Sequence, residues 1–276
     1  MNLNIFEAII LGIFQGISEF LPISSSGHLV LLNHLFGIKE GTIFSTAMFH
    51  FGTFLSIIIV YFKDIINIIK ETIYMIIDFI KYKKLKIDNR YRILSIMIIA
   101  ASIPTALLYI LFDDFFENLY GSLLSVGIAF IITGIILVIA EKGVEGKRNV
   151  YDLKVRDAIF IGIFQGFAIA PGISRSGSTI VGGLFRKLNK KVATKLSFFI
   201  ALPAIFGASL LQFLEVFSGE SNLEITVPII IGTIFSAITG ILAIKFLINL
   251  LQKGKLYYFS IYLWIIGLII IVSNFV

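Results

Sequence analysis

The chain has 276 residues, of which 58% are hydrophobic and 14% are charged, and its formal net charge is +6. A soluble domain carries about 25% charged residues, so this composition excludes an ordinary soluble enzyme and indicates a lipid bilayer as the solvent. The basic residues gather in short segments between apolar stretches, which favours a role in membrane orientation over nucleic-acid binding. Because there is no cysteine, disulfides and thiolate metal sites are excluded.

Six apolar segments have the length that a helix needs to cross about 30 Å of hydrocarbon. They are residues 42–62, 91–112, 121–140, 192–214, 226–248 and 256–275. Between the first two, charges within residues 64–80 leave one apolar face, which predicts a helix lying in the membrane interface. Residues 1–14 lack a basic start and a small-residue cleavage site, so we expect no cleaved signal peptide.

Loop charges predict how these spans are oriented. Lys and Arg concentrate in residues 81–92, 141–156 and 186–195, whereas residues 113–120 and 215–225 contain acids but neither Lys nor Arg. Basic loops stay on the cytoplasmic side, so the first three are expected inside and the other two outside. The six spans then alternate between the two sides without conflict.

Two other apolar segments, residues 3–36 and 157–187, are interrupted by Pro, Gly and Ser clusters and do not fit a simple span. The second lies between two basic loops, so it should enter and return on the cytoplasmic side. The first precedes a span that runs inward, so it should enter and return from outside. Irregular backbone at membrane depth is tolerated where protein buries it or where it lines a wet cavity. The functional site is therefore expected at these two breaks.

The two interrupted segments repeat one sequence. Residues 12–28 (GIFQGISEFLPISSSGH) match residues 162–178 (GIFQGFAIAPGISRSGS) at nine of 17 positions without a gap. Each copy is followed by three spans, and three is an odd number, so the second half is predicted to lie upside down relative to the first. Inverted repeats with interrupted helices place a ligand site near the membrane midplane. A repeat kept only for packing is the alternative.

The predicted fold is an all-α integral membrane protein, with six transmembrane helices and two re-entrant helix–loop–helix elements in two inverted repeats. We expect a single membrane domain over residues 1–276. Repeat one covers about 1–140, repeat two covers about 157–276, and the cytoplasmic loop 141–156 joins them.

Each copy of the repeat places serines where a new helix begins, as an N-cap requires. Two helix N-termini aimed at one point attract an anion through their free backbone N–H groups and their dipoles. Arg175 adds a guanidinium fork that suits phosphate oxygens. A phosphorylated ligand is therefore expected. The predicted substrate-binding residues are Gln15, Ser24, Ser26, Gly27, Ser174, Ser176, Gly177 and Thr179.

Glu19 and Arg175 are ionisable groups at membrane depth, where such groups are costly and usually functional. Glu19 follows Gln15 by four residues, so both side chains lie on one face of the entering half-helix. We expect Glu19 to act as a general base or to bind a divalent cation, Mg²⁺ or Ca²⁺, with Gln15 as a second oxygen ligand. A purely structural ion pair between Glu19 and Arg175 is the alternative.

The nucleophile stays open between two residues. His28 is expected to be a nucleophile or a proton donor to the leaving group, or else a buried neutral imidazole held by a carbonyl. Ser25 becomes a nucleophile if His28 or Glu19 removes its proton. His50 is a weaker candidate that either faces the same cavity or packs elsewhere. Lys245 lies near a cytoplasmic span end, where a long side chain reaches the interface.

The motifs QGISEFLPISSSGH (15–28) and PGISRSGST (171–179) closely resemble the two signature regions of the undecaprenyl-diphosphatase, or bacitracin-resistance, family. The similarity of layout covers essentially the whole chain. The resemblance implies hydrolysis of undecaprenyl diphosphate to the monophosphate carrier lipid used in cell-wall synthesis. It also implies that four residues carry the activity: Glu19, Ser25, His28 and Arg175. Many members have a second glutamate where this chain has Gln15, so a metal site here would hold one fewer negative charge.

The expected partners are a polyprenyl diphosphate lipid and the bilayer of the plasma membrane, and a homodimer is an open assembly state. The rival function is a transporter or flippase for a polyprenyl phosphate or another anion, because inverted repeats with broken helices are typical of transporters. The sequence feature against the rival is the pair Glu19 and His28, since a protein that only binds an anion gains nothing from a carboxylate nearby.

Overall fold

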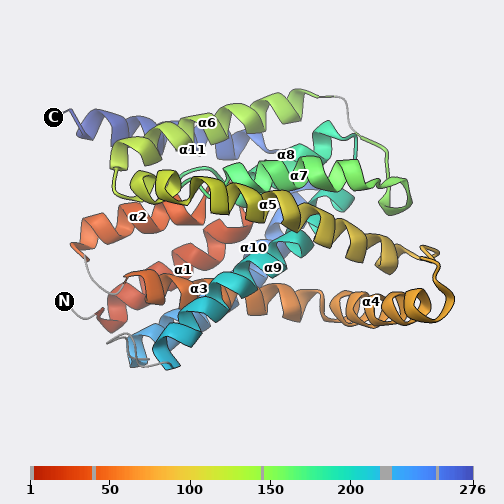
Figure 1. The fold of residues 1–276 in the computed structure, drawn as a ribbon. Coiled ribbons are helices and arrows are strands. Elements are labelled where there is room, and N and C mark those ends of the chain that lie inside the picture. Colours follow the sequence, from red (N-terminus) through yellow and green to blue (C-terminus); the bar gives the residue numbers. More distant parts are fainter. Residues whose placement is uncertain (1–2, 39–41, 144–145, 218–225, 253–254, 276) are drawn as a thin grey trace.

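The computed structural model is all-helical over the residues that it describes, 3–38, 42–143, 146–217, 226–252 and 255–275 (Figure 1). In chain order the helices are α1 (Ile5–Phe20), α2 (Ser25–Phe36), α3 (Thr42–Val60), α4 (Phe62–Tyr82), α5 (Arg90–Tyr120), α6 (Leu123–Lys142), α7 (Val155–Phe167), α8 (Arg175–Phe185), α9 (Lys190–Phe217), α10 (Val227–Gln252) and α11 (Tyr257–Ser273). A short 3₁₀ helix, η1 (Val150–Asp152), lies between α6 and α7. The predicted all-α class is confirmed for these residues.

Four of the described helices, α5, α6, α9 and α10, are long and apolar enough to cross a membrane. A fifth span results if α3 and α4 are counted together, although an 87° bend separates them. The last helix, α11, is apolar but only 17 residues long. By length and composition this is an integral membrane protein with four to five candidate spans among the described helices.

The predicted outer loop at residues 113–120 is wrong, because α5 continues through it to Tyr120. This stretch contains neither Gly nor Pro before Gly121, so nothing in it stops a helix. The chain instead kinks at Phe112, whose φ of −127° is not helical. The other predicted outer loop, 215–225, lies outside the described residues from position 218 onward.

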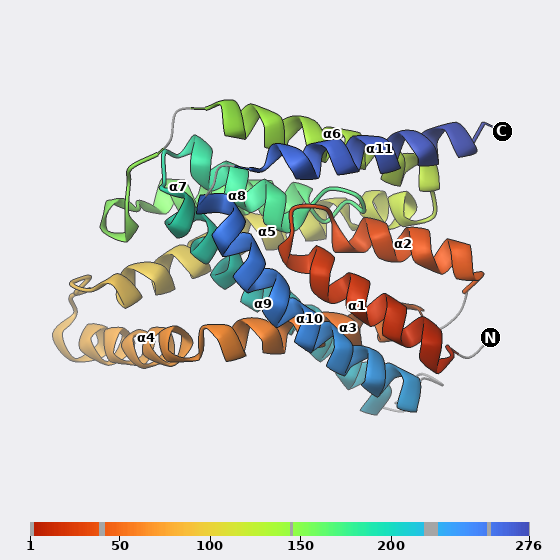
Figure 2. The same cartoon turned by 180° about the vertical axis from the view of Figure 1, so that it is seen from behind.

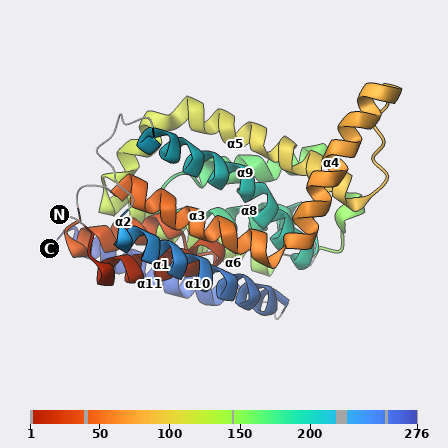
Figure 3. The ribbon, with the colours of Figure 1, turned by 90° about the horizontal axis from the view of Figure 1, so that it is seen from below.

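The helix predicted at residues 64–80 is α4, which turns sharply away from α3 and extends beyond the other helices beside the start of α5 (Figure 3). Arg92 of α5 pairs with Glu71 and Asp78 of α4, each at 2.9 Å. The exposed apolar side chains of α4 include Ile69, Ile73, Ile76 and Ile80. A helix bent off a span, with one polar and one exposed apolar side, has the geometry of an interfacial helix.

Both interrupted segments fold as helical hairpins. Residues 21–24 separate α1 from α2, and residues 168–174 separate α7 from α8. Pro22 lies in the first break, and Gly172 lies in the second with a φ of 94°, which favours glycine. The hairpins extend from opposite ends of the molecule, and their breaks meet near its middle (Figure 2). The predicted helix–loop–helix shape is confirmed by these breaks.

Glycines let the first helix of each hairpin lie close against a long neighbouring helix. Gly12 and Gly16 face α10, where a Cβ on Gly12 would overlap the backbone of Gly232. Gly162 and Gly166 face α5, where added Cβ atoms would overlap that helix in the same way. Small residues at such contacts allow close packing between membrane helices. The register of α1 is thereby fixed on α10, and that of α7 is fixed on α5.

A buried carboxylate ties the loop after α6 to the end of α8. Asp157, at the start of α7, is fully buried and accepts hydrogen bonds from Arg148 Nη2 and from Arg186 Nε, each at 2.6 Å. Arg148 Nη1 also donates to the carbonyl oxygen of Arg186 at 2.7 Å. This cluster joins the segment between the two halves to the second hairpin.

Replacing Asp157 by asparagine is expected to lower the free energy of unfolding by about 2 kcal/mol, because two guanidinium groups keep their charge and lose the carboxylate. The loss is smaller than for a fully buried pair, since Arg148 and Arg186 are 28% and 30% exposed. Thermal unfolding in detergent measures the effect, with Asp114→Asn at an exposed position as the control. Equal unfolding temperatures for the two variants would contradict a stabilising role of the cluster.

Candidate active site

The end of α1 presents Gln15 and Glu19 at the break of the first hairpin. Gln15 Nε2 donates to Glu19 Oε2 at 2.9 Å, one helical turn away. Gln15 is fully buried and Glu19 is 5% exposed. The shared face predicted from their four-residue spacing is confirmed.

The N-terminus of α2 lies against the same carboxylate. Ser24 is the N-cap, and its hydroxyl accepts a hydrogen bond from the Gly27 backbone N–H at 3.3 Å. Its φ of 69° is uncommon for serine and marks the sharp turn between the two helices. Ser25 Oγ donates to Glu19 Oε2 at 2.6 Å, and Ser26 Oγ lies 3.3 Å from Ser24 Oγ. The first motif therefore places a hydroxyl directly on a buried carboxylate.

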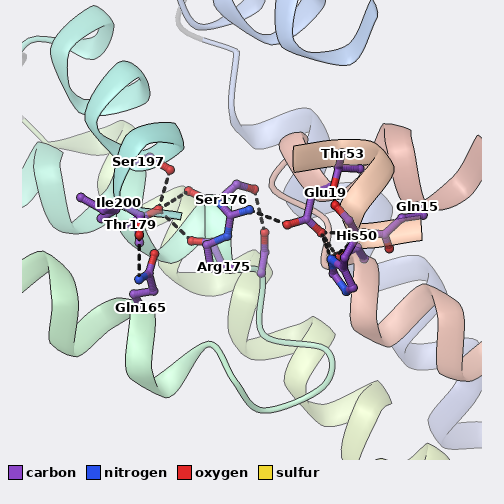
Figure 4. Close-up of polar contacts among 12 residues, drawn as sticks. Gln15, Glu19, His50, Thr53, Gln165, Arg175, Ser176, Thr179, Ser197 and Ile200 are labelled. Atoms are coloured by element: carbon purple, nitrogen blue, oxygen red, sulfur yellow. Dashed lines mark hydrogen bonds and ion pairs between the residues drawn. The ribbon is translucent and has the colours of Figure 1, made fainter. Parts of the chain in front are cut away.

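The second hairpin supplies Arg175 from the first residue of α8. Ser174 caps this helix and accepts from the Gly177 backbone N–H at 3.1 Å. Arg175 Nη2 then donates to Glu19 Oε1 at 2.5 Å across the two breaks (Figure 4). The serine N-caps expected at the two breaks are Ser24 and Ser174, and residues 156 positions apart in sequence meet at one carboxylate.

Two other residues of the second motif hold the breaks together. Ser176 Oγ donates to the Leu21 carbonyl oxygen at 3.0 Å, which joins the second break to the first. Thr179 Oγ1 donates to the Arg175 carbonyl oxygen at 2.8 Å and lies 2.6 Å from Ser197 Oγ on α9. These hydroxyls bond to protein and brace the turn that carries Arg175, while substrate binding by them stays a prediction.

Two buried polar atoms at the site have no hydrogen-bond partner among the described residues: Arg175 Nη1 and Gln15 Oε1. Leaving a buried polar group unpaired costs roughly 1–3 kcal/mol, so each of these atoms is available to a water molecule or a ligand. A guanidinium nitrogen takes an acceptor such as a phosphoryl oxygen, whereas an amide oxygen takes a cation or an N–H or O–H donor. The site thus has an unused donor for an anion.

His28 lies next to this network but forms its own hydrogen bonds elsewhere. Its Nδ1 is 2.8 Å from the Ser24 carbonyl oxygen, and its Nε2 is 2.7 Å from the Tyr262 hydroxyl on α11. The ring is 2% exposed and packs against Phe130 and Tyr262. This is the geometry of the alternative, a buried imidazole held by a carbonyl. A catalytic role for His28 stays a prediction.

His50 on α3 enters the site, although the sequence made it only a weak candidate. Its Nδ1 lies 2.8 Å from Gln15 Nε2 and 3.2 Å from Glu19 Oε2 (Figure 4). The His50 side chain is 26% exposed and the Glu19 side chain is 5% exposed, so the histidine is the more accessible of the two contacting groups. The sequence signal for a role of His50 is a single histidine within an apolar span, and this signal does not reveal which helix the ring contacts.

The first hairpin offers oxygen donors for a divalent cation. Within the described ranges no group of three or more His, Cys, Asp or Glu residues could hold a metal ion. Gln15 Oε1, the Glu19 carboxylate and the Ser25 hydroxyl are nevertheless hard oxygen donors of the kind that Mg²⁺ and Ca²⁺ prefer. Because Gln15 turns its amide nitrogen toward Glu19, its oxygen would have to rotate to share a cation with the carboxylate. These residue types suit a hard cation, and the cation stays a prediction.

The fold and the site define an integral membrane protein with a buried polar site, where a carboxylate-bound hydroxyl and an arginine meet between two helical hairpins. Comparison with known proteins adds the family. Residues 8–269 match the family model described as bacitracin resistance protein BacA, and the chain belongs to this family.

Similar proteins match the chain over nearly its whole length. It is 48% identical over 271 residues to an undecaprenyl-diphosphatase of Alkaliphilus metalliredigens, with 98% of each chain covered. It is 42% identical to an undecaprenyl-diphosphatase of Carboxydothermus hydrogenoformans, with 98% of this chain and 97% of the relative covered. Identity to undecaprenyl-diphosphatase 4 of Bacillus cereus is 39%, over 99% and 98% of the two chains. The resemblance predicted from the two motifs is confirmed.

Proposed function

We propose that this protein is a membrane hydrolase that removes the terminal phosphate of undecaprenyl diphosphate, giving undecaprenyl phosphate and inorganic phosphate. The observation that carries the proposal is the guanidinium of Arg175, which binds Glu19 through Nη2 and keeps Nη1 buried without a partner. An anion at this nitrogen also lies near the N-termini of α2 and α8. The names of the relatives support a diphosphate lipid as the substrate.

Ser25 is the residue best placed to attack the terminal phosphorus. Its hydroxyl proton passes to Glu19 as the Oγ–P bond forms and the bridging P–O bond breaks, and Glu19 then protonates the departing undecaprenyl phosphate. Water next adds its OH to phosphorus, and its other proton returns through Glu19 to Ser25 Oγ. Arg175 stabilises the negative charge on the phosphoryl oxygens in both steps. The contacts of His28 with Ser24 and Tyr262 rank it below Ser25 as the nucleophile.

Gln15, Glu19 and Ser25 are the residues that would hold a divalent cation. Bound there, such an ion would neutralise part of the diphosphate charge. Since Gln15 contributes no charge, Glu19 is the only carboxylate of this set, and we expect weaker cation binding than a pair of carboxylates would give.

We also propose two inverted repeats with six spans, in one membrane domain. Helix contacts support this arrangement: α1 packs on α10 as α7 packs on α5, and the contacts of α6 with α11 and of α3 with α9 each join a helix to its counterpart in the other repeat. The same symmetry is common among transporters, so a flippase for a polyprenyl phosphate or another anion is the second candidate. The Ser25–Glu19 hydrogen bond favours the hydrolase, because translocation does not require an activated hydroxyl.

The proposed location is the plasma membrane, where the monophosphate product re-enters cell-wall synthesis and its supply limits the action of bacitracin. The family description supports the link to this antibiotic. A homodimer is the proposed assembly, and light scattering of the purified protein in detergent measures it.

Release of inorganic phosphate tests the proposed function. We expect the purified protein in detergent to release phosphate from undecaprenyl diphosphate and to yield the monophosphate. Parallel reactions with Mg²⁺, with Ca²⁺ and with a chelator measure the dependence on a cation. Binding of the lipid without phosphate release in any of these reactions would contradict the hydrolase, and lipid transfer between the leaflets of proteoliposomes would then test the flippase.

A further inference from the structure

We infer that His50 is a positioning residue for this reaction, which orients the Gln15 amide and so holds the Glu19 carboxylate against Ser25. The inference rests on the proposed hydrolase function and concerns a residue outside both sequence motifs. His50 belongs to α3, and among the described side chains of this helix it alone joins the hydrogen bonds around Glu19. Its contribution therefore depends entirely on how α3 is placed beside α1.

The amide of Gln15 is fixed by two acceptors at once. Its Nε2 carries two hydrogens, and it lies 2.9 Å from Glu19 Oε2 and 2.8 Å from His50 Nδ1. An amide N–H donates, so Nδ1 accepts and the ring proton lies on Nε2. With both hydrogens in use, a rotation of the amide would lose two hydrogen bonds and turn its oxygen toward a carboxylate. His50 thereby keeps the N–H of Gln15 on Glu19.

Glu19 Oε2 is the oxygen that this arrangement serves. It accepts from Gln15 Nε2 and from Ser25 Oγ and also lies 3.2 Å from His50 Nδ1, whereas Oε1 accepts from Arg175. The oxygen that takes the proton of Ser25 is thus held from the opposite side by Gln15, whose amide is held by His50. Catalytic groups must be fixed to a fraction of an ångström, and the residues behind them supply that restraint.

Helix α10 sets the distance between His50 and the first hairpin. Ser236 of α10 donates to the Phe49 carbonyl oxygen at 2.7 Å, and Ser56 of α3 donates to the Ala237 carbonyl oxygen at 2.8 Å. The same face of α10 receives the glycines of α1. Because α1 and α3 share one closely packed partner helix, their registers are coupled, and His50 meets Gln15 reproducibly.

The second half of the chain provides an internal comparison. Gln165 follows Gln15 by 150 residues, and Ile200 follows His50 by the same number. Gln165 Nε2 donates to the Ile200 carbonyl oxygen at 3.3 Å, so α9 meets this glutamine at the position where α3 meets the other (Figure 4). In the second half the glutamine contacts a backbone carbonyl where Gln15 contacts a ring nitrogen, and no imidazole is present.

The carboxylate is missing from the second half as well. Ile169 follows Glu19 by the same 150 residues, so this half has neither the acid nor the histidine. If His50 served only the packing of two helices around a buried glutamine, the second half would need it equally. The imidazole occurs where the carboxylate occurs, as expected of a residue that acts through the carboxylate.

Three substitutions of His50 separate these roles. Asparagine places an amide oxygen near the position of Nδ1, glutamine places its polar group near Nε2, and leucine removes the acceptor. We expect His50→Leu to lower kcat for phosphate release from undecaprenyl diphosphate on the order of 30-fold, with KM changed less than about twofold, because His50 does not contact the anion-binding helix ends. His50→Asn should restore most of the lost kcat, and His50→Gln should not.

A double variant tests whether His50 acts through Gln15. We expect Gln15→Leu with His50→Leu to be within about twofold of Gln15→Leu alone, because Nδ1 accepts from the amide and its 3.2 Å approach to Glu19 Oε2 then joins two acceptors without a hydrogen bond. Losses that simply multiply would contradict the inference. The matched control on α3 is Thr53→Val, which removes a buried hydroxyl that donates only to the His50 carbonyl oxygen, and it should keep the wild-type kcat.

Two further outcomes overturn the inference while the wild type is active. One is full kcat in His50→Leu. The other is a lowered unfolding temperature in His50→Leu, with kcat equally low in the asparagine and glutamine variants, which would assign His50 to the packing of α3. A wild type without phosphate release contradicts the proposed function itself, so the two failures are distinct.

Discussion

Replacing Arg175 by alanine is expected to reduce kcat/KM for undecaprenyl diphosphate by about 10³-fold or more. Arg175 is the cation at the meeting point of the two helix N-termini, and its free Nη1 is buried where a phosphoryl oxygen would lie. An arginine that stabilises a transferring phosphoryl group contributes roughly 10³–10⁵-fold in comparable enzymes. Phosphate release over a range of lipid concentrations measures the loss.

Arg175→Lys distinguishes the guanidinium fork from the charge alone. A lysine ammonium is a point charge that cannot bind Glu19 and a phosphoryl oxygen in the same planar geometry. We therefore expect the kcat/KM of Arg175→Lys to stay at least about tenfold below that of the wild type, a loss of roughly 1.4 kcal/mol or more. Arg156→Ala, at an exposed position in the first turn of α7, is the matched control. Wild-type turnover in Arg175→Ala would rule out the proposed site.

Glu19→Gln is expected to lower kcat by about 10³-fold while the protein still folds. Glutamine keeps the shape of the side chain and can still accept hydrogen bonds, but it cannot take the proton of Ser25. General-base catalysis typically contributes roughly 10²–10⁴-fold, and the amide also leaves Arg175 without its counter-charge. Single-turnover phosphate release separates this loss in the chemical step from any change in lipid binding.

Glu7→Gln is the matched control for that substitution, because it lies on the same helix and glutamine also completes a capping box. The structural alternative, in which Glu19 and Arg175 form only an ion pair, makes a different prediction. Glu19→Gln and Arg175→Ala would then both show lower unfolding temperatures, and the double variant Glu19→Gln with Arg175→Met would recover activity. Persistent inactivity of the double variant at normal stability supports the catalytic role.

The local parts of the site could be predicted from the sequence because local rules control them. Pro22 and Gly172 lie in the two breaks, where they interrupt the helices, and serine caps the helix that follows each break. The four-residue spacing of Gln15 and Glu19 places them on one helix face in any tertiary context. These features depend on a few neighbouring residues, so a short stretch of sequence is enough to predict them.

The contacts between distant helices could not be predicted in the same way. In a membrane protein the lipid-facing and buried sides of a span are both apolar, so periodicity does not reveal which face carries His50 toward Gln15. The partner of His28 is equally remote, since Tyr262 lies 234 residues further along the chain. The acidic residues before Tyr120 favour a loop by their charge, whereas in the structure this stretch is the helical end of α5.

The ion pair between Glu19 and Arg175 also has a consequence for biosynthesis. Its members are 156 residues apart, so at roughly 5–20 residues per second the ribosome takes about 8–30 s to add Arg175 after Glu19. Throughout that interval the nascent first hairpin has no cation for its carboxylate, and an unpaired charge is costly within a bilayer. The first hairpin therefore cannot settle into its final position until the α7–α8 hairpin has been inserted, which makes the joining of the two breaks a late step of assembly.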